Sequence, residues 1–462
     1  MSGAAHNKNT DAKGNRFEPS AYHLDSIEMV NHRGEGKFIE NMVVKFSISE
    51  SLYSPTCVLF VSIKDSVNFF ESFPCIGQET IKIILKQKEH NTDIEKTLEM
   101  KFFITEYPTY GRAPQQNHTQ VYRIKAISEQ AFISGHKKIS RAYEYQPTSS
   151  IIQNILERDC NLALSDFTLS GETKSKIKWI CPYMTPFDAL EQIRARSYDS
   201  NGAPYYLFQT ISGQTNFVSH SAIVAEPIYQ SYFDARQFSS DPNTEKDYVE
   251  RATRILDCAS NIKLAKLEQS MGGAYASETY ALDYTTKSYK QKIYTYDHEQ
   301  VNTLEQNPTI SEKFVFSDGV NTPVKRADEF TSAHVDYIAT NTGAYKDEVN
   351  DDMSDSGLLY NDLSTKGIAK LNSYRAIANS TSHDLTLFGD LQINPGRVIE
   401  LLFPKALDPE QLKEYLETDA SDVYDRSLSG KYFIAATEHK FEAGEYYVKC
   451  RVKRDSTAVE IK

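Results

Sequence analysis

Alternation of apolar and polar residues with a period of two runs through most of the chain and predicts β-strands. The clearest run lies near the C-terminus. Its apolar positions are Tyr446, Val448, Cys450 and Val452, and its cationic positions are Lys449, Arg451 and Lys453. Because successive side chains of a strand point to opposite faces, we expect a half-buried strand with a cationic outer face.

Three more strand-length runs precede this one: DLTLF, RVIELLF and KYFIAATEHKF. Residues that tolerate turn dihedrals separate the four runs, namely Gly389, Asn394-Pro395-Gly396, Gly430 and Gly444. The pattern predicts a small antiparallel barrel or sandwich over residues 381–462. The acidic insert at 405–427 departs from the strand pattern and predicts a helix-bearing excursion.

A second group of strands lies near the N-terminus. The run NMVVKFSIS alternates Met42, Val44, Phe46 and Ile48 with Lys45, Ser47 and Ser49. The runs VLFVSIKD, ETIKIILKQK, EMKFFITEY and VYRIKAIS follow at spacings of about 15 to 20 residues, each flanked by turn or polar residues. We expect a first β-barrel domain at residues 21–135. Residues 1–20 are polar and predict a disordered or docking arm.

The period changes from two to that of a helix after Pro147, which predicts an α/β domain at residues 136–232. TSSIIQNILERDC predicts a helix near 148–160 behind a Thr148 or Ser149 cap. TPFDALEQIRARS predicts a helix near 185–198, with Thr185 as the N-cap, Pro186 at the first helical position, Asp188 in the capping box and Gly202 as the stop. YYLFQT and TNFVSH flank Ile211-Ser212-Gly213-Gln214 and predict a hairpin at 205–220.

Residues 233–380 predict a mixed middle region. Its first half reads as helical, Tyr-rich strands follow the break at Gly272-Gly273, and LSTKGIAKLNSYRAIANS predicts a closing helix. The acidic stretch at 341–362 lacks the glycine and glutamate spacing of a calcium loop and is taken as a solvated loop. The Gly pair lacks the G-x-G-x-x-G spacing of a dinucleotide loop.

Length and composition agree with a β-rich protein of several domains. The 462 residues exceed what one hydrophobic core normally serves and predict about three domains. The 29 Tyr and 23 Phe against one Trp favour strands over helical bundles. We therefore predict an α+β fold that is mostly β, with barrel-like units at both ends and a mixed α/β region between them.

The charge and the cysteines narrow the class of protein. With 51 Lys and Arg against 63 Asp and Glu, the net charge is −12, which argues against general adhesion to nucleic acid. Six scattered cysteines without a C-x-x-C pair predict buried free thiols. The N-terminus lacks an apolar signal region and no run approaches the roughly 20 apolar residues of a membrane helix, so we expect no membrane anchor.

Motifs that carry enzyme chemistry are absent from the sequence. There is no G-x-S-x-G, no H-E-x-x-H and no P-loop, and the eleven histidines are dispersed. Asp65, Glu71 and Glu79 lie near Lys64, but charges of this kind commonly protect strand edges, so we take them as solvated loop charges rather than paired catalytic carboxylates. We assign no catalytic, cofactor-binding or metal-binding residue, and no cofactor.

Three stretches, in this order, resemble the baseplate central hub of contractile-tailed phages, the family shared with the base of VgrG spikes. The first carries Glu50, Ser51, Leu52, Tyr53, Asp65, Pro74, Gly77 and Glu79. The second joins SSIIQNILER to TPFDALEQIRARS and YYLFQT. The third carries Gly389, Gly396, Gly430, Lys431, Tyr432, His439 and Asp455. The resemblance covers about Leu24 to Ser456.

The resemblance implies a non-enzymatic homotrimer in which each chain contributes two tube-like barrels to a six-barrel ring. Such a ring adapts the sixfold tail tube on one face to a trimeric spike on the other, and baseplate wedge proteins are further partners. The chain ends directly after the second barrel, so the spike is expected to be a separate polypeptide. The expected location is the tail baseplate of the virion, after assembly in the host cytoplasm.

The charge suggests how DNA would pass through such a ring. Three chains of −12 each give about −36, and an acidic lumen would let DNA pass without adhesion, although Lys449, Arg451 and Lys453 would oppose this if they faced the lumen. Two other classes stay open: a carboxylate-based peptidoglycan hydrolase or peptidase, and a carbohydrate-binding module suggested by the many tyrosines. Val398 is expected on an edge strand, where Val398→Lys would disrupt ring assembly.

Overall fold

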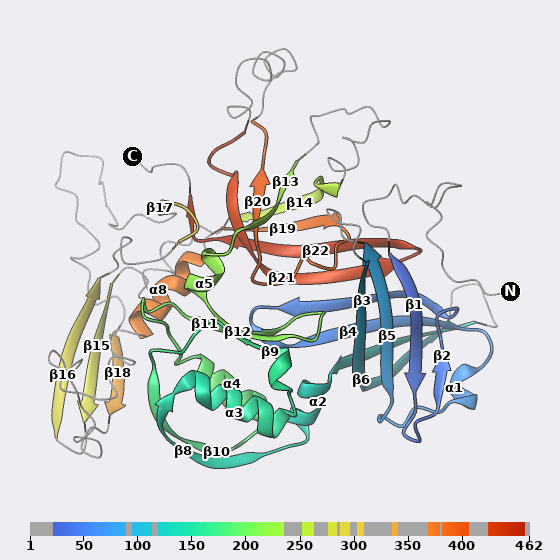
Figure 1. Ribbon diagram of the computed structural model, residues 1–462, viewed down its shortest axis with the longest axis horizontal. Coiled ribbons are helices and arrows are strands. Elements are labelled where there is room, and N and C mark those ends of the chain that lie inside the picture. Colours follow the sequence, from blue (N-terminus) through green and yellow to red (C-terminus); the bar gives the residue numbers. More distant parts are fainter. Residues whose placement is uncertain are drawn as a thin grey trace.

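The protein has an α+β fold that is mostly β, as the sequence predicts (Figure 1). The computed structural model describes residues 22–88, 95–112, 119–234, 252–262, 276–283, 287–295, 303–308, 335–340, 368–378, 381–405 and 424–457. Four features considered in the sequence lie outside these residues: the arm at 1–20, the acidic loop at 341–362, the Gly272-Gly273 break and most of the insert at 405–427. The described part contains one large sheet, four small sheets and the helices packed against them.

The large sheet has 13 strands within the described ranges and joins both ends of the chain. Its main path runs β14-β19-β22-β21-β3-β4-β7-β6-β5-β1-β2. The strands from the N-terminal part are β1 His23–Val30, β2 Gly36–Phe38, β3 Val43–Ser51, β4 Ser54–Asp65, β5 Thr80–Lys88, β6 Glu95–Arg112 and β7 Gln120–Ser128. Those from the later part are β13 Ile228–Phe233, β14 Ile255–Ile262, β19 Thr381–Phe388, β20 Val398–Leu402, β21 Gly430–Glu442 and β22 Glu445–Arg454.

The four strands expected near the C-terminus are all present, and β22 has the expected alternation. Its apolar residues are 0 to 2% exposed, and its cations lie on the opposite face. Gly396, in the turn before β20, has a φ of +87°, which favours glycine, and its N–H donates to the Ile434 carbonyl at 2.8 Å.

The N-terminal and C-terminal strands meet where β3 pairs with β21 in antiparallel register, from Ser51 opposite Ala436 to Lys45 opposite Glu442 (Figure 1). A single apolar core lies behind the joint, and it combines Ile48 and Leu59 with Phe441 and Val448. Each such side chain contributes about 1.5–3 kcal/mol when fully buried. The two ends of the sequence therefore share one core through a continuous sheet.

A buried glutamine makes a second link between the two ends. Nε2 of Gln87 donates to the Gly389 carbonyl at 2.8 Å, and Oε1 accepts from the Leu391 N–H at 2.9 Å. Gln87 lies near the end of β5 and Gly389 directly follows β19, so the pair fixes the end of one strand against the turn after the other.

The α/β unit packs below the large sheet in the view of Figure 1. Its elements are α2 Glu129–Gly135, β8 Ile139–Pro147, α3 Thr148–Cys160, η1 Leu164–Asp166, β9 Phe167–Leu169, β10 Lys176–Met184, α4 Pro186–Arg194, β11 Tyr205–Gln209, β12 Thr215–Ser219 and α5 His220–Val224. The apolar stripe of α3 and that of α4 close one core with Trp179 and Phe217. The two predicted helices and the predicted hairpin are thus present.

Helix α3 has the predicted range of 148–160, but its predicted cap and the predicted end of α4 are wrong. Thr148 and Ser149 do not cap α3 but lie inside its first turn, where they are buried and bond to hydroxyls: Oγ1 of Thr148 is 2.9 Å from Oγ1 of Thr173 and 2.8 Å from Oγ of Ser175. Helix α4 ends at Arg194, well before Gly202, which instead sits in a turn with a φ of +82°. The first error comes from contacts distant in sequence that compete with local capping, and at the second Gly202 closes a local turn by donating to the Asp199 carbonyl at 3.1 Å.

The start of α4 follows the predicted capping box and supports a test of local stability. Oγ1 of Thr185 accepts from the Asp188 N–H at 3.2 Å, and Pro186 occupies the first turn. We expect Thr185→Ala to lower the free energy of unfolding by about 1 kcal/mol, because it leaves an amide of the first turn without its acceptor. Urea denaturation would measure the loss. The Thr185→Ser variant keeps the hydroxyl and should stay near wild type, and an equal loss in both variants would contradict the capping role.

The small elements of the middle region only partly follow the prediction. The Tyr-rich strands β15 Ala276–Asp283 and β16 Ser288–Thr295 pair with each other, and β15 also pairs with β18 Val335–Thr340. The closing helix is α8 Ile368–Ala378. The prediction of a helix is wrong over Ile255–Ile262, which forms β14 along β19, because pairing with a sheet edge outweighs the helical spacing of a short apolar run.

Two expected side-chain placements are also wrong. Val44 was expected in the core, but a register shift between Val43 and Lys45 turns it outward, and it is 47% exposed. Val398 was expected on an edge strand, but β20 pairs with β21 on one side and, in parallel, with β13 on the other, so Val398 is 1% exposed. A lysine at Val398 would therefore disrupt the core rather than report on assembly.

Candidate functional surface

The large sheet has a polar face opposite its apolar core, and this face crosses the joint between β3 and β21. We call the outward side chains of β6, β7, β4, β3, β21, β22 and β19 the polar face. In register, Lys45, Ser47 and Ser49 of β3 lie opposite Glu442, Lys440 and Glu438 of β21. On the other side of β3 they lie opposite residues of β4, among them Ser62 and Phe60. The polar face is therefore built from both ends of the chain.

Four cations on the polar face are paired with acids, three of them across strands. The Nζ to carboxylate distances are 2.7 Å for Lys125–Glu106, 3.4 Å for Lys45–Glu442 and 3.2 Å for Lys440–Glu438. Arg451 binds Asp384 with two bonds, 2.7 Å from Nε and 3.0 Å from a terminal nitrogen. Ion pairs this exposed add at most about 1 kcal/mol each to stability, so their main effect is on the surface potential.

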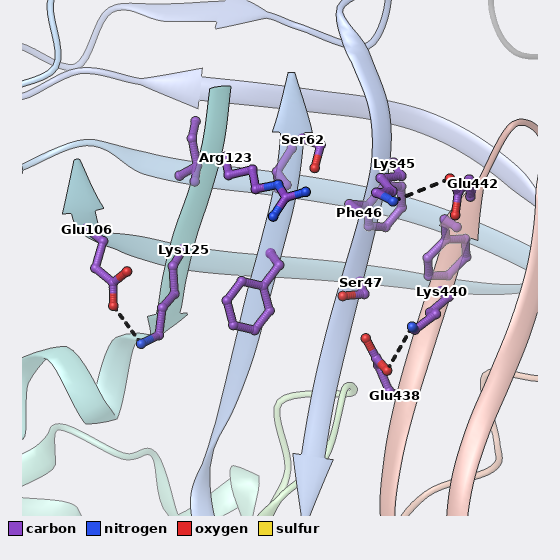
Figure 2. A pocket seen from close by; sticks show the side chains of 14 residues that line it. Lys45, Phe46, Ser47, Ser62, Glu106, Arg123, Lys125, Glu438, Lys440 and Glu442 are labelled. Atoms are coloured by element: carbon purple, nitrogen blue, oxygen red, sulfur yellow. Dashed lines mark hydrogen bonds and ion pairs between the residues drawn. The ribbon is translucent and has the colours of Figure 1, made fainter. Parts of the chain in front are cut away.

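A hollow opens on this face between β7, β4, β3 and β21 (Figure 2). Phe60 lies in it with 46% of its side chain exposed, and the ion pairs of Lys125, Lys45 and Lys440 surround it. Arg123 also lines the hollow, and within the described residues it makes no ion pair. The hollow is thus amphipathic and carries both signs of charge.

The cationic strip of β22 belongs to the polar face, but its charges are partly offset. Arg451 is held by Asp384, and Lys449 lies opposite Glu438 in the register. Nζ of Lys453 lies 3.0 Å from the Tyr53 hydroxyl and 4.9 Å from the centre of its ring. The feature that the sequence shows as a run of three cations is therefore a mixed-charge surface in the fold.

Glu50 is a buried carboxylate at the joint, where three distant segments converge. Its side chain is fully buried. Oε1 accepts from the Ile211 N–H at 2.6 Å, and Oε2 is 3.4 Å from the Thr437 hydroxyl. Nε2 of His439 lies 3.7 Å from Oε1, and Nδ1 of the same ring is 2.8 Å from the Tyr446 hydroxyl. Glu50 thereby connects β3, β21 and the hairpin of the α/β unit.

Burial shifts the protonation of this cluster toward neutral forms. Desolvation raises the pKa of Glu50 to about 8, although the hydrogen bonds from Ile211 and Thr437 oppose the shift. Desolvation lowers the pKa of His439 to about 3. A protonated Glu50 beside a neutral His439 is therefore the favoured state at pH 7, and the two do not form a charged pair.

A second buried cluster centres on His220 and Asp455, which are 1% and 2% exposed. Nε2 of His220 is 2.9 Å from the Asp455 carboxylate, whose other oxygen accepts from the Leu304 N–H at 3.0 Å. The ring of His220 also packs edge-on against Tyr374 and Phe433. This cluster ties α5, α8 and the C-terminal strand together, and its burial gives it a structural role rather than access to a substrate.

Two of the three acidic residues near Lys64 accept hydrogen bonds from backbone N–H groups. Asp65 accepts from the N–H groups of Val67 and Phe69 at 2.9 and 2.7 Å, and Glu79 accepts from those of Ile76 and Gly77 at 2.7 and 2.9 Å. Both are at most 2% exposed, so the expectation of solvated charges is wrong for these two. They are buried because each shapes a turn next to α1 Phe69–Ser72.

The described residues contain no group of three or more His, Cys, Asp or Glu side chains arranged to hold a metal ion. All six cysteines are free thiols, five of them buried. Within the described ranges, no helix has the length and apolar character needed to cross a membrane.

The convergence of Glu50 with Ile211 and Thr437 had no signal in the sequence, because 161 and 387 residues separate these partners.

Comparison with known proteins identifies the fold. No protein-family model matches the chain, and no curated protein matches it. A tail protein from Neisseria meningitidis MC58 superposes with a TM-score of 0.51 and 10% identity over 94% of this chain and 97% of that one. The 43 kDa tail protein of prophage MuSo2 from Shewanella oneidensis gives the same score and identity over 94% and 99%. The chain therefore has the fold of these tail proteins, and the expected resemblance to phage tail proteins is confirmed at the level of the fold.

Proposed function

We propose that the protein is a structural hub of a phage tail baseplate: a homotrimeric ring that adapts the sixfold tail tube to a threefold spike and forms part of the DNA passage. The likeness to two tail proteins over nearly the whole length of all three chains carries this proposal. In this role the protein acts without catalysis in the virion tail, after assembly in the host cytoplasm. Its partners are the tube protein, a separate trimeric spike protein and the wedge proteins of the baseplate.

The same proposal divides the chain into four parts after the arm at 1–20. Residues 21–135 and 381–462 form the two tube-like units, 136–232 the α/β domain and 233–380 the middle region. The joint between β3 and β21 supports a rigid pair, because it fixes the angle between the two tube-like units within one subunit. Three rigid pairs give a quasi-sixfold layer on a threefold axis.

The ends of the large sheet suggest where neighbouring subunits meet. In the described part of the chain, β2 and β14 end the main path of the sheet, and both carry exposed apolar side chains: Phe38 is 68% exposed and Leu256 is 43% exposed. A ring needs a head-to-tail interface between two different surfaces of the subunit. We propose that the β2 end of one subunit meets the β14 end of the next.

Mass measurement in solution tests the proposal directly. The purified chain should sediment at three times its mass of 52.5 kDa, and a monomer at all concentrations would overturn the trimeric hub. Phe38→Lys should shift the population toward monomers by placing a charge at the proposed interface. The matched control is Tyr183→Lys, at a residue that is 72% exposed in the separate two-stranded sheet β8–β10. Retained trimers in Phe38→Lys would contradict the placement of the interface.

A further inference from the structure

The hollow around Phe60 has a simple cause in the register of the strands. In one row across the sheet, Ser62 of β4 lies between Arg123 of β7 and Lys45 of β3. In the next row of the same face, Ser47 of β3 lies beside Phe60 of β4. Because the two serines are much shorter than their neighbours, they leave a hollow of about 460 Å³. This volume lies within the range of about 300–1,000 Å³ that small-molecule sites have.

Arg123 carries the charge in the hollow that no acid offsets. Four cations and three acids line it, so its net charge is +1. Each of the three lysines contacts one of the acids at 2.7 to 3.4 Å: Lys45, Lys125 and Lys440. Within the described ranges, Arg123 makes no hydrogen bond or ion pair. Its guanidinium group can therefore donate to a ligand without first breaking a bond to the protein.

The uncharged groups of the hollow are available as well. Among the residues that the structure describes, the hydroxyls of Ser47 and Ser62 make no hydrogen bond, and the ring of Phe60 contacts no other ring. Phe60 is also 46% exposed. Figure 2 shows the side chain of Arg123 extending from β7 across β4 toward Ser62. A guanidinium group, two hydroxyls and an aromatic ring thus converge on one hollow with their binding capacity unused.

We propose that the hollow is a binding site for an aromatic monocarboxylate, whose carboxylate accepts from Arg123 and Ser62 and whose ring packs on Phe60. Charge-assisted hydrogen bonds and packing of aromatic rings are the interactions that these groups form best. A phosphate dianion fits less well, because its second charge would lie among the three glutamates of the hollow. This inference goes beyond the proposed function, since it requires neither a trimer nor a passage for DNA.

Saturation-transfer NMR with 3-phenylpropionate tests the site on the full chain. We expect a dissociation constant on the order of 1 mM, as for other ligands of this size. The neutral analogue 3-phenylpropanamide lacks the charge and butyrate lacks the ring, and each should bind about ten-fold or more weakly. No binding of 3-phenylpropionate at 20-fold the expected constant, about 20 mM, or equal binding of the acid and the amide, would overturn the proposal.

Substitutions in the protein locate the binding. Arg123→Gln and Phe60→Thr should each weaken the binding of 3-phenylpropionate about ten-fold or more. Arg33→Gln is the matched control, because it removes the same charge from an exposed position in the turn between β1 and β2, and it should bind as wild type does. Unchanged binding by Arg123→Gln, or an equal loss in Arg33→Gln, would overturn the site. If Phe60→Thr fails to fold by circular dichroism, Arg123→Gln still decides, since Arg123 is exposed.

A free organic acid and a C-terminal phenylalanine of another polypeptide carry the same chemistry, and a tetrapeptide ending in phenylalanine distinguishes them. Tighter binding of the peptide than of 3-phenylpropionate, lost when its terminus is amidated, would assign the site to a chain terminus. Weaker binding of the peptide would assign it to a free acid. Sedimentation of the same samples tests the hub separately, because a monomer that binds the acid overturns only the trimer. A trimer that binds neither acid overturns only the site.

Discussion

At pH 9 the Glu50→Gln variant should be more stable than the wild-type protein by several kcal/mol, whereas near pH 5 the two should have nearly the same free energy of unfolding. The reason is the buried position of Glu50 at the joint between β3, β21 and the α/β hairpin. Burial raises the pKa of Glu50 from 4.5 to about 8, so the folded protein keeps a proton that the unfolded chain releases. Stability is therefore lost as pH rises through this window, on the order of 4 kcal/mol.

The glutamine keeps the shape of the side chain and an oxygen that can accept from the Ile211 N–H, but it carries no charge at any pH. The difference between variant and wild type should thus grow between pH 5 and pH 8 and then level off. Urea denaturation at several pH values measures it. The control is Glu71→Gln at an exposed glutamate, which should give a curve parallel to wild type. Parallel curves for Glu50→Gln as well would show that Glu50 is ionised in the folded protein.

The loss of stability at acid pH should come from other groups. The pKa of His439 is lowered to about 3 and that of His383 to about 4, in both cases mainly by desolvation. The unfolded chain binds these protons below about pH 6.5 and the folded protein does not, so stability falls as pH decreases from there. Through these histidines the free energy of unfolding rises with pH, whereas through Glu50 it falls with pH. Glu50→Gln should therefore remove the loss of stability above pH 5 and leave the loss of stability at acid pH unchanged.

The second large effect is expected at Gly389. A Cβ atom at this position would overlap the ring of Tyr446, which is fully buried and stacks on Phe441 at 4.2 Å between ring centres. The backbone there cannot move away easily, because the Gly389 N–H donates to the Tyr446 carbonyl and its own carbonyl accepts from Gln87. Gly389→Ala should cost about 3 kcal/mol or more through overpacking.

Chemical denaturation of Gly389→Ala would show a lower midpoint, with Gly135→Ala as the matched control. A Cβ at Gly135 meets nothing within 4 Å, and this residue ends α2 with an ordinary φ, so the control should stay within about 0.5 kcal/mol of wild type. Equal midpoints for both variants would mean that the ring of Tyr446 can move aside. That result would contradict a tightly packed core beside the joint.

Local patterns in the sequence were sufficient to predict those elements that depend on residues close in the chain. The alternation of β22 and the capping box of α4 are both present, because strand faces and helix starts depend on a few adjacent residues. The same reasoning failed for β14, whose short apolar run took its conformation from β19, more than a hundred residues later. It also failed for Thr148, whose hydroxyl found partners in other segments instead of capping its helix.

The candidate surface illustrates the same limit. The three cations of β22 are visible in the sequence as a basic strip, but their acidic neighbours are Asp384 on β19 and Glu438 on β21. Only pairing of the strands brings these charges together. In the sequence, Glu50 is likewise not distinguishable from the other polar residues of its strand. It is buried because the hairpin turn and β21 cover it.

The joint between β3 and β21 also determines when the protein can reach its final form during synthesis. Lys45 and its partner Glu442 are 397 residues apart. At about 5–20 residues per second, a ribosome needs roughly 20–80 s to make the intervening chain. Throughout that time β3 has one unpaired edge, which could pair with another nascent chain. We therefore expect slow folding with high contact order, and a need for chaperone protection of the β3 edge until β21 leaves the ribosome.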